Sequence, residues 1–217
     1  MAFDILDEHE QGELVRQWLR ENAVSIAVGV GLGLALIFGW QQWRVHRVHH
    51  NAEAAAQYHA MSAAFDDKRT SDAEKIAAAL RKDFPDTSYA VFAAMRQADL
   101  ASGNGDAKTA ATELAWARDH AGVPALKTLA GLRLARVTLA QGDADGALKL
   151  LDALPEDDYG ALASELRGDA LVKLGRTDDA RAAYQKALAG IDPQAPDRNF
   201  IQMKFDDLAP VKEKQGS

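Results

Sequence analysis

The sequence predicts an all-α protein, with a single N-terminal transmembrane helix followed by an α-solenoid of repeated helix pairs and a C-terminal capping helix. Three observations lead to this prediction. Residues 22–43 carry no formal charge, glycines in equivalent turns recur at intervals of 37 and 33 residues, and an apolar helical segment follows the last repeat. The expected domains are a short head over 1–21, a span over 22–43, a repeat domain over 44–209 and a disordered tail over 210–217.

The first element is the uncharged run between Glu21 and Arg44. Its 22 residues form about 33 Å of helix, which is enough to cross the hydrocarbon core of a bilayer. Trp18 precedes the run, and Trp40 and Trp43 lie at its end, where indole rings favour the headgroup layers. The run therefore predicts a transmembrane helix, with the lipid bilayer as its first partner.

Two other interpretations of this run fit the residues poorly. Gly29, Gly31 and Gly33 have the spacing G-x-G-x-G, whereas a dinucleotide-binding loop needs G-x-G-x-x-G between a strand and a helix. A cleaved signal peptide would have a shorter apolar region and a small-residue cleavage site directly after it. Here the run ends in WQQWR at 40–44, so we expect an uncleaved anchor.

Glycines within the span are candidates for helix packing. Gly29 and Gly33 form a G-x-x-x-G pair, and Gly39 adds another small surface. Such spacing permits close approach of a second copy or of another membrane protein. Glycine is also common in spans that pair with nothing, so the residues leave both interpretations open.

Charge does not fix which side of the membrane carries the C-terminal domain. Orientation follows the balance of Lys and Arg close to the span. Arg16 and Arg20 on one side are matched by Arg44 and Arg47 on the other. The residues alone leave both topologies open.

Downstream of the span, the sequence repeats in units of two helices. Gly105, Gly142 and Gly175 occupy matching places in three copies, and the clearest copy reads ELRGDALVKLGRTDDARAAYQKAL over 165–188. The pattern resembles the 34-residue tetratricopeptide repeat, an antiparallel helix pair whose stacked copies bury the larger side chains. In this reading Ala147 and Ala180 are packing residues at helix crossings.

Further helices are expected on both sides of these copies. A more degenerate pair is expected over 54–67 and 71–85, and no helix breaker separates Trp43 from Asp66. One helix is therefore expected to run from Glu13 to Asp66. At the far end, NFIQMKFDDLA over 199–209 has apolar residues at helical spacing and would cover the last open face of the solenoid.

Composition excludes several classes of function. The chain has no cysteine, which removes disulfides, thiol catalysis and Cys-ligated zinc. Its net charge of −7 offers no footprint for nucleic acid. No signature of a serine hydrolase, zinc peptidase or P-loop enzyme is found. We therefore predict no catalytic, cofactor-binding or metal-ligating residue, and no enzyme activity.

Three histidines next to the span form the one cluster with metal-ligand chemistry. His46 and His50 are one helical turn apart, and His49 lies between them. A metal site needs about three ligands and a supporting second shell, and no carboxylate is placed with these residues. A polar collar at the headgroup boundary is the simpler interpretation, and a metal-dependent enzyme subunit is the alternative.

The first helix of each tetratricopeptide-like pair would line a concave, protein-binding groove. Matching positions in the three copies give six candidates, Phe92, Met95, Leu129, Leu132, Leu162 and Glu165. Most are apolar, as a groove for an extended or helical polypeptide requires. The alternative is that some of them pack against neighbouring helices or the capping element.

The order of these features resembles the YfgM-like ancillary subunits of the bacterial SecYEG translocon. The resemblance rests on VRQWLREN, the glycine-rich span, DFPDTSYAVFAAMRQADLA, LAWARD, LRLARVTLA, ELRGDAL and MKFDDLA, and it covers nearly the whole chain. It implies a bacterial inner-membrane protein with a cytoplasmic N-terminus and a periplasmic repeat domain. It also implies contact with SecYEG and with a membrane-anchored periplasmic chaperone of the prolyl-isomerase type, PpiD.

With this resemblance, the sequence is expected to encode a non-enzymatic scaffold that binds protein partners at the periplasmic exit of the translocon, translocating polypeptides among them. Tethering would raise the effective concentration of a weak binding surface. The alternative is a membrane-tethered adapter that sequesters a cytoplasmic regulator or assembles with itself as an interaction hub.

Overall fold

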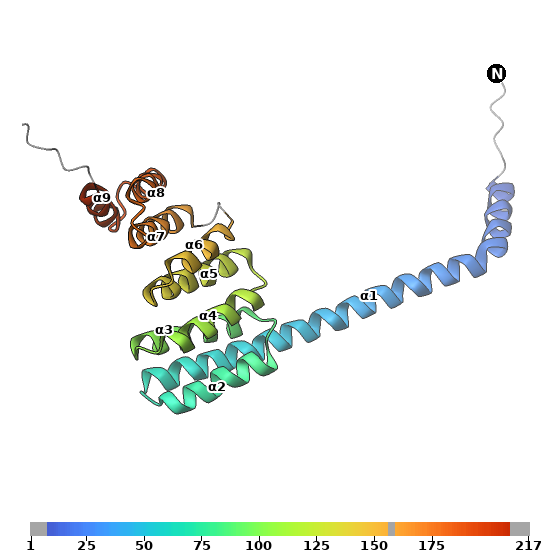
Figure 1. The fold of residues 1–217 in the computed structure, drawn as a ribbon. Coiled ribbons are helices and arrows are strands. Elements are labelled where there is room, and N and C mark those ends of the chain that lie inside the picture. Colours follow the sequence, from blue (N-terminus) through green and yellow to red (C-terminus); the bar gives the residue numbers. More distant parts are fainter. Residues whose placement is uncertain (1–7, 156–158, 209–217) are drawn as a thin grey trace, which may run out of the picture. The chain divides into compact units, whose positions relative to one another are not determined.

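The computed structural model describes residues 8–155 and 159–208, and every regular element in these ranges is an α-helix (Figure 1). The contacts divide the chain into two units, one ending at Ala52 and the other beginning at Glu53. The predicted tail over 210–217 and the first seven residues of the predicted head lie outside the described residues. The helices are α1 (Glu8–Asp66), α2 (Thr70–Asp83), α3 (Ser88–Gly103), α4 (Ala107–His120), α5 (Pro124–Ala140), α6 (Ala144–Asp152), α7 (Gly160–Lys173), α8 (Thr177–Gly190) and α9 (Arg198–Asp207).

The apolar run lies in the N-terminal unit, on helix α1. Its large side chains are exposed, with Val24 at 78% and Leu36 at 75% of their full accessible surface. The helix is long and apolar enough to cross a membrane, and none of its most apolar stretch is buried. Exposed apolar surface of this extent is rare on soluble proteins, whereas hydrocarbon would solvate it.

Helix α1 extends beyond the apolar run to Asp66, as the sequence predicts, and begins five residues earlier than the expected Glu13. Its last part belongs to the repeat unit, where Ala54, Met61 and Ala64 are fully buried. They share one core cluster with Ala73, Ala77 and Leu80 of α2 and with Ala90 and Ala93 of α3. The first, degenerate helix pair is therefore the end of α1 together with α2.

In the part of the chain that the structure describes, the two helices of each of the four pairs are joined by the same kind of turn. Gly105, Gly142 and Gly175 have φ angles of 77°, 89° and 72°, which glycine adopts without a Cβ penalty. Lys68, with φ of 61°, occupies this place in the first pair. In each turn the next residue donates its N–H to the carbonyl five residues back, in Arg69 to Ala64, Asp106 to Ala101, Asp143 to Thr138 and Arg176 to Leu171, at 2.8, 2.8, 3.2 and 2.9 Å. This is the Schellman motif that ends helices, and it confirms the three predicted turn glycines.

Small side chains allow the helices of the repeat unit to approach. Ala110, Ala147 and Ala180 occupy matching places in α4, α6 and α8, and all three are fully buried. Consecutive helices from α2 to α9 contact one another, and the first helices of adjacent pairs, α3 with α5 and α5 with α7, also touch. The predicted packing roles of Ala147 and Ala180 are confirmed.

Helix α9 covers the end of the stack, as predicted for a capping helix. Ile201 is fully buried in a cluster with Tyr184 and Ala187 of α8. Phe205 and Leu208 pack partly buried against the same cluster. Figure 1 shows α9 beside α7 and α8, and the all-α solenoid with a terminal cap is confirmed.

Candidate protein-binding surface

The six groove candidates lie in different environments. Met95 and Leu132 are each only 5% exposed and belong to two core clusters. Phe92, Leu129 and Leu162 are half-buried and pack against these clusters. Met95 and Leu132 therefore have little surface to offer a partner, whereas the other three keep part of their side chains accessible.

The packing of the repeats explains why Leu132 turns inward. It shares a cluster with Leu151 of α6 and Leu166 of α7, so the second helix of its own pair and the first helix of the next pair cover it. A first helix in a solenoid has neighbours on several sides, and only a narrow stripe of its surface stays open. Matching positions in the repeat do not separate accessible residues of the first helices from buried ones.

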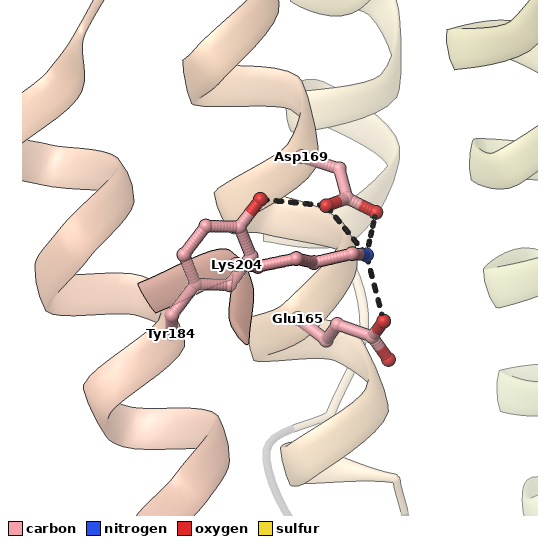
Figure 2. Close-up of polar contacts among 4 residues, drawn as sticks. All are labelled: Glu165, Asp169, Tyr184 and Lys204. Atoms are coloured by element: carbon pink, nitrogen blue, oxygen red, sulfur yellow. Dashed lines mark hydrogen bonds and ion pairs between the residues drawn. The ribbon is translucent and has the colours of Figure 1, made fainter. Parts of the chain in front are cut away.

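The sixth candidate, Glu165, is engaged by the capping helix. The Nζ atom of Lys204 in α9 lies 2.9 Å from Glu165 Oε1 and 2.8 Å from both carboxylate oxygens of Asp169 (Figure 2). The Lys204 and Glu165 side chains are only 18% and 12% exposed. Glu165 therefore joins α7 to α9, and a partner would have to displace Lys204 to reach it.

A tyrosine extends this polar network to α8. The hydroxyl of Tyr184 donates a hydrogen bond to Asp169 Oδ1 at 2.7 Å (Figure 2). Burial raises the pKa of Tyr184, and the hydrogen bond and charge of Asp169 raise that pKa further, so the hydroxyl stays protonated as a donor. Its ring lies so close to Gly168 that a Cβ there would overlap it. We call Glu165, Asp169, Tyr184 and Lys204 the α9 clasp.

One departure from the repeat pattern is a sequence signal for the α9 clasp. Glu165 is acidic at a place where the two other copies have Met95 and Leu132. An acid in an otherwise apolar position indicates that the following element supplies a cation, because buried charges are paired. Lys204 is that cation, but the register of α9 on α7 could not be read from the repeat.

A second polar cluster joins α2 to α4. The Arg81 guanidinium lies 2.6 Å from the Glu113 carboxylate and over the ring of Trp116, 5.7 Å from its centroid. His120 stacks on the same indole, with ring centroids 4.1 Å apart. Burial raises the pKa of Glu113, although Arg81 opposes that shift. The arrangement connects α2 of the first helix pair to α4 of the second. Trp116, at its centre, is the one tryptophan in the sequence after residue 53.

A hollow of about 440 Å³ opens where α4, α5 and α6 meet. Leu150 and Leu154 form part of its apolar lining, and Arg118 and Lys127 are among its polar residues. Gly131 gives Leu154 its place, because a Cβ on Gly131 would lie 2.7 Å from the Leu154 Cδ2 atom. The volume is within the range of ligand pockets, and no motif in the sequence pointed to it.

Comparison with known proteins identifies the family of this chain. Residues 16–210 match a family model described as a tetratricopeptide repeat-like domain. The ancillary SecYEG translocon subunit of Escherichia coli (strain K12) is 31% identical over 207 residues, which cover 94% of this chain and 97% of that protein. The chain belongs to the ancillary SecYEG translocon subunit family. The member from Haemophilus influenzae (strain ATCC 51907 / DSM 11121 / KW20 / Rd) is 30% identical, over 86% of this chain and 91% of its own length.

The glycines of the span, which the sequence marks as candidates for helix packing, lie in open surroundings. A Cβ built on Gly29, Gly33 or Gly39 meets no atom of the chain within 4 Å. Their surface is thus open within the N-terminal unit. Whether a second helix packs there stays a prediction.

The histidines next to the span lie close together on α1. The rings of His46 and His50 stack with centroids 6.4 Å apart. Within residues 8–155 and 159–208, no group of three or more His, Cys, Asp or Glu side chains could hold a metal ion.

Proposed function

We propose that this protein is a membrane-anchored, non-catalytic adapter that associates with SecYEG and presents its repeat domain at the periplasmic exit. One observation carries the proposal. The unburied apolar run and the helix repeats occur in one chain, and this chain matches relatives named ancillary SecYEG translocon subunit over nearly their whole length.

The accessible groove residues indicate how a partner could bind. Phe92 belongs to an aromatic cluster in which the Tyr58 ring lies 6.1 Å from Phe92 and 6.0 Å from Tyr89. With the half-buried Leu129 and Leu162, this offers separate apolar contacts rather than one deep pocket. Such a surface suits weak binding of an extended or helical segment, from a translocating polypeptide or from a PpiD-like chaperone.

Because the protein is tethered to the membrane, a modest affinity of its binding surface is sufficient. A binding surface held on the membrane next to the exit meets emerging segments at a high effective concentration, so the contacts themselves need not be strong. Catalysis has no part in this mechanism. The repeat-like fold and the relatives' name as a subunit both support an adapter role.

Orientation can be tested with single cysteines, because the chain contains none. Ser102 and Gly12 are exposed, in α3 and near the start of α1. In spheroplasts, we expect a membrane-impermeant maleimide to label Ser102→Cys, while Gly12→Cys reacts only after the membrane is permeabilised. Labelling is read as a mass shift on a gel.

The reverse pattern would overturn the periplasmic placement. If Gly12→Cys were labelled and Ser102→Cys protected, the repeat domain would face the cytoplasm. The alternative function, an adapter that sequesters a cytoplasmic regulator or assembles as an interaction hub, would then replace the proposal.

A further inference from the structure

The two ends of the membrane-spanning run differ in their charge pattern. After the run come Arg44, His46, Arg47, His49 and His50, and the first acidic residue is Glu53. We call these five residues the juxtamembrane collar. It contains two permanent cations and three imidazole rings, without a carboxylate among them.

The opposite end of the run mixes both signs. Arg16 and Arg20 are flanked by Glu13 and Glu21, and Gln17 donates a hydrogen bond to Glu21 at 3.0 Å. The number of arginines at each end is equal, but Arg44 and Arg47 have no acidic residue between them or before Glu53, whereas Arg16 and Arg20 each have a glutamate within three residues. A count of Lys and Arg alone conceals this difference.

The geometry of α1 packs one collar cation against a tryptophan at the end of the run. The Arg47 guanidinium lies over the ring of Trp43, 5.2 Å from its centroid, and Trp43 is 5.2 Å from Trp40, centroid to centroid. Tryptophan rings at the end of a span favour the headgroup layer. In a bilayer, a guanidinium packed on such a ring would lie near the level of the lipid phosphates, where its planar N–H groups can form bidentate hydrogen bonds to phosphate oxygens.

We propose that the juxtamembrane collar binds the phosphates of anionic phospholipids and gathers these lipids around this end of the span. Arg44 and Arg47 supply the charge, and the imidazoles of His46 and His49 add hydrogen-bonding nitrogens without negative charge. Phosphate is the complementary group at this depth, and clustered cations beside a span attract anionic headgroups. The inference rests on the membrane insertion in the proposed function, but not on the side that the collar faces.

Quenching of tryptophan fluorescence by brominated lipids tests this proposal in an intact bilayer. The full-length chain with Trp18→Phe keeps Trp40 and Trp43 beside the collar, while Trp116 in the repeat domain gives a constant background. The protein is reconstituted in mixed phosphatidylglycerol and phosphatidylcholine vesicles, with bromine on one lipid or the other. At low salt, we expect the binding constant for phosphatidylglycerol near these tryptophans to be about five times that for phosphatidylcholine.

Charge-neutral variants locate the effect. Arg44→Gln with Arg47→Gln should return the relative binding constant to near unity, and so should 1 M salt, which shortens the screening length to about 3 Å. Arg16→Gln with Arg20→Gln removes the same charge from the other end and should leave the value unchanged.

The possible results distinguish a failure of the collar proposal from a failure of the proposed membrane insertion. Equal quenching by both brominated lipids, or enrichment that survives loss of both collar arginines, would overturn the collar proposal while membrane insertion stands. Absence of quenching by either lipid would show that the run does not enter the bilayer, and the proposed function would fail with it.

Discussion

Replacing Gly168 by leucine should lower the free energy of unfolding of the repeat domain by about 3 kcal/mol, through overpacking between α7 and α8. A Cβ at Gly168 would overlap the Tyr184 ring. That ring cannot easily move away, because Tyr184 is only 3% exposed and its hydroxyl is held by Asp169. Urea denaturation of the repeat domain, with and without Gly168→Leu, measures the difference in the free energy of unfolding.

The same helix provides a matched control. Gly160→Leu places the side chain where a Cβ meets no atom within 4 Å, so the free energy of unfolding should change by less than about 0.5 kcal/mol, as for most surface substitutions. Tyr184→Ala should absorb part of the Gly168→Leu cost, making the double variant less destabilised than the sum of the two. Strict additivity would contradict a direct contact between these residues.

Replacing Lys204 by methionine should release α9 from the rest of the stack. The change leaves Glu165 and Asp169 without the cation that both contact at 2.8 to 2.9 Å. Loss of one partner of a buried pair costs 3–5 kcal/mol, and partial exposure reduces this to about 2 to 3 kcal/mol. Amide hydrogen exchange in α9 should therefore accelerate roughly 30- to 150-fold, whereas exchange in α3 and α4 should hardly change.

Two further variants show whether the α9 clasp is responsible. Lys173→Met removes an exposed lysine from α7 and should leave exchange in α9 unaltered. Combining Lys204→Met with Glu165→Gln and Asp169→Asn removes the uncompensated carboxylates and should restore part of the protection. Unchanged exchange in α9 after Lys204→Met alone would mean that the apolar contacts of Ile201 hold the helix without the ion pairs.

Much of the fold was predictable because the same turn conformation, and the glycine that it favours, recur in successive repeats. Gly105, Gly142 and Gly175 were recognisable from spacing alone, and their positive φ angles show the physical reason for their identity. The corresponding turn in the first pair was obscure, because Lys68 adopts the same conformation with φ of 61°. A lysine gives no sequence signal there, so this pair could be seen only as degenerate.

The candidate surface was less predictable, because it depends on how neighbouring helices cover one another. Equivalent positions placed Met95 and Leu132 in the groove, but packing against adjacent helices buries both. Glu165 has its partner in Lys204, 39 residues away, and local spacing contains no information about that contact. The pocket beside Gly131 likewise depends on how Leu154 meets α5.

The central claim is that this chain is anchored beside SecYEG, and photocrosslinking from within the span tests it most directly. A photoreactive phenylalanine analogue would replace Gly29, Gly33 or Gly31, each of which has open space around its Cβ position. At about 100° per residue, Gly31 lies on the opposite helix face from the other two. In native membranes, the account predicts adducts with SecYEG subunits from positions 29 and 33 and much weaker ones from 31. The absence of any SecYEG adduct from all three positions, in membranes where the protein is fully inserted, would contradict it.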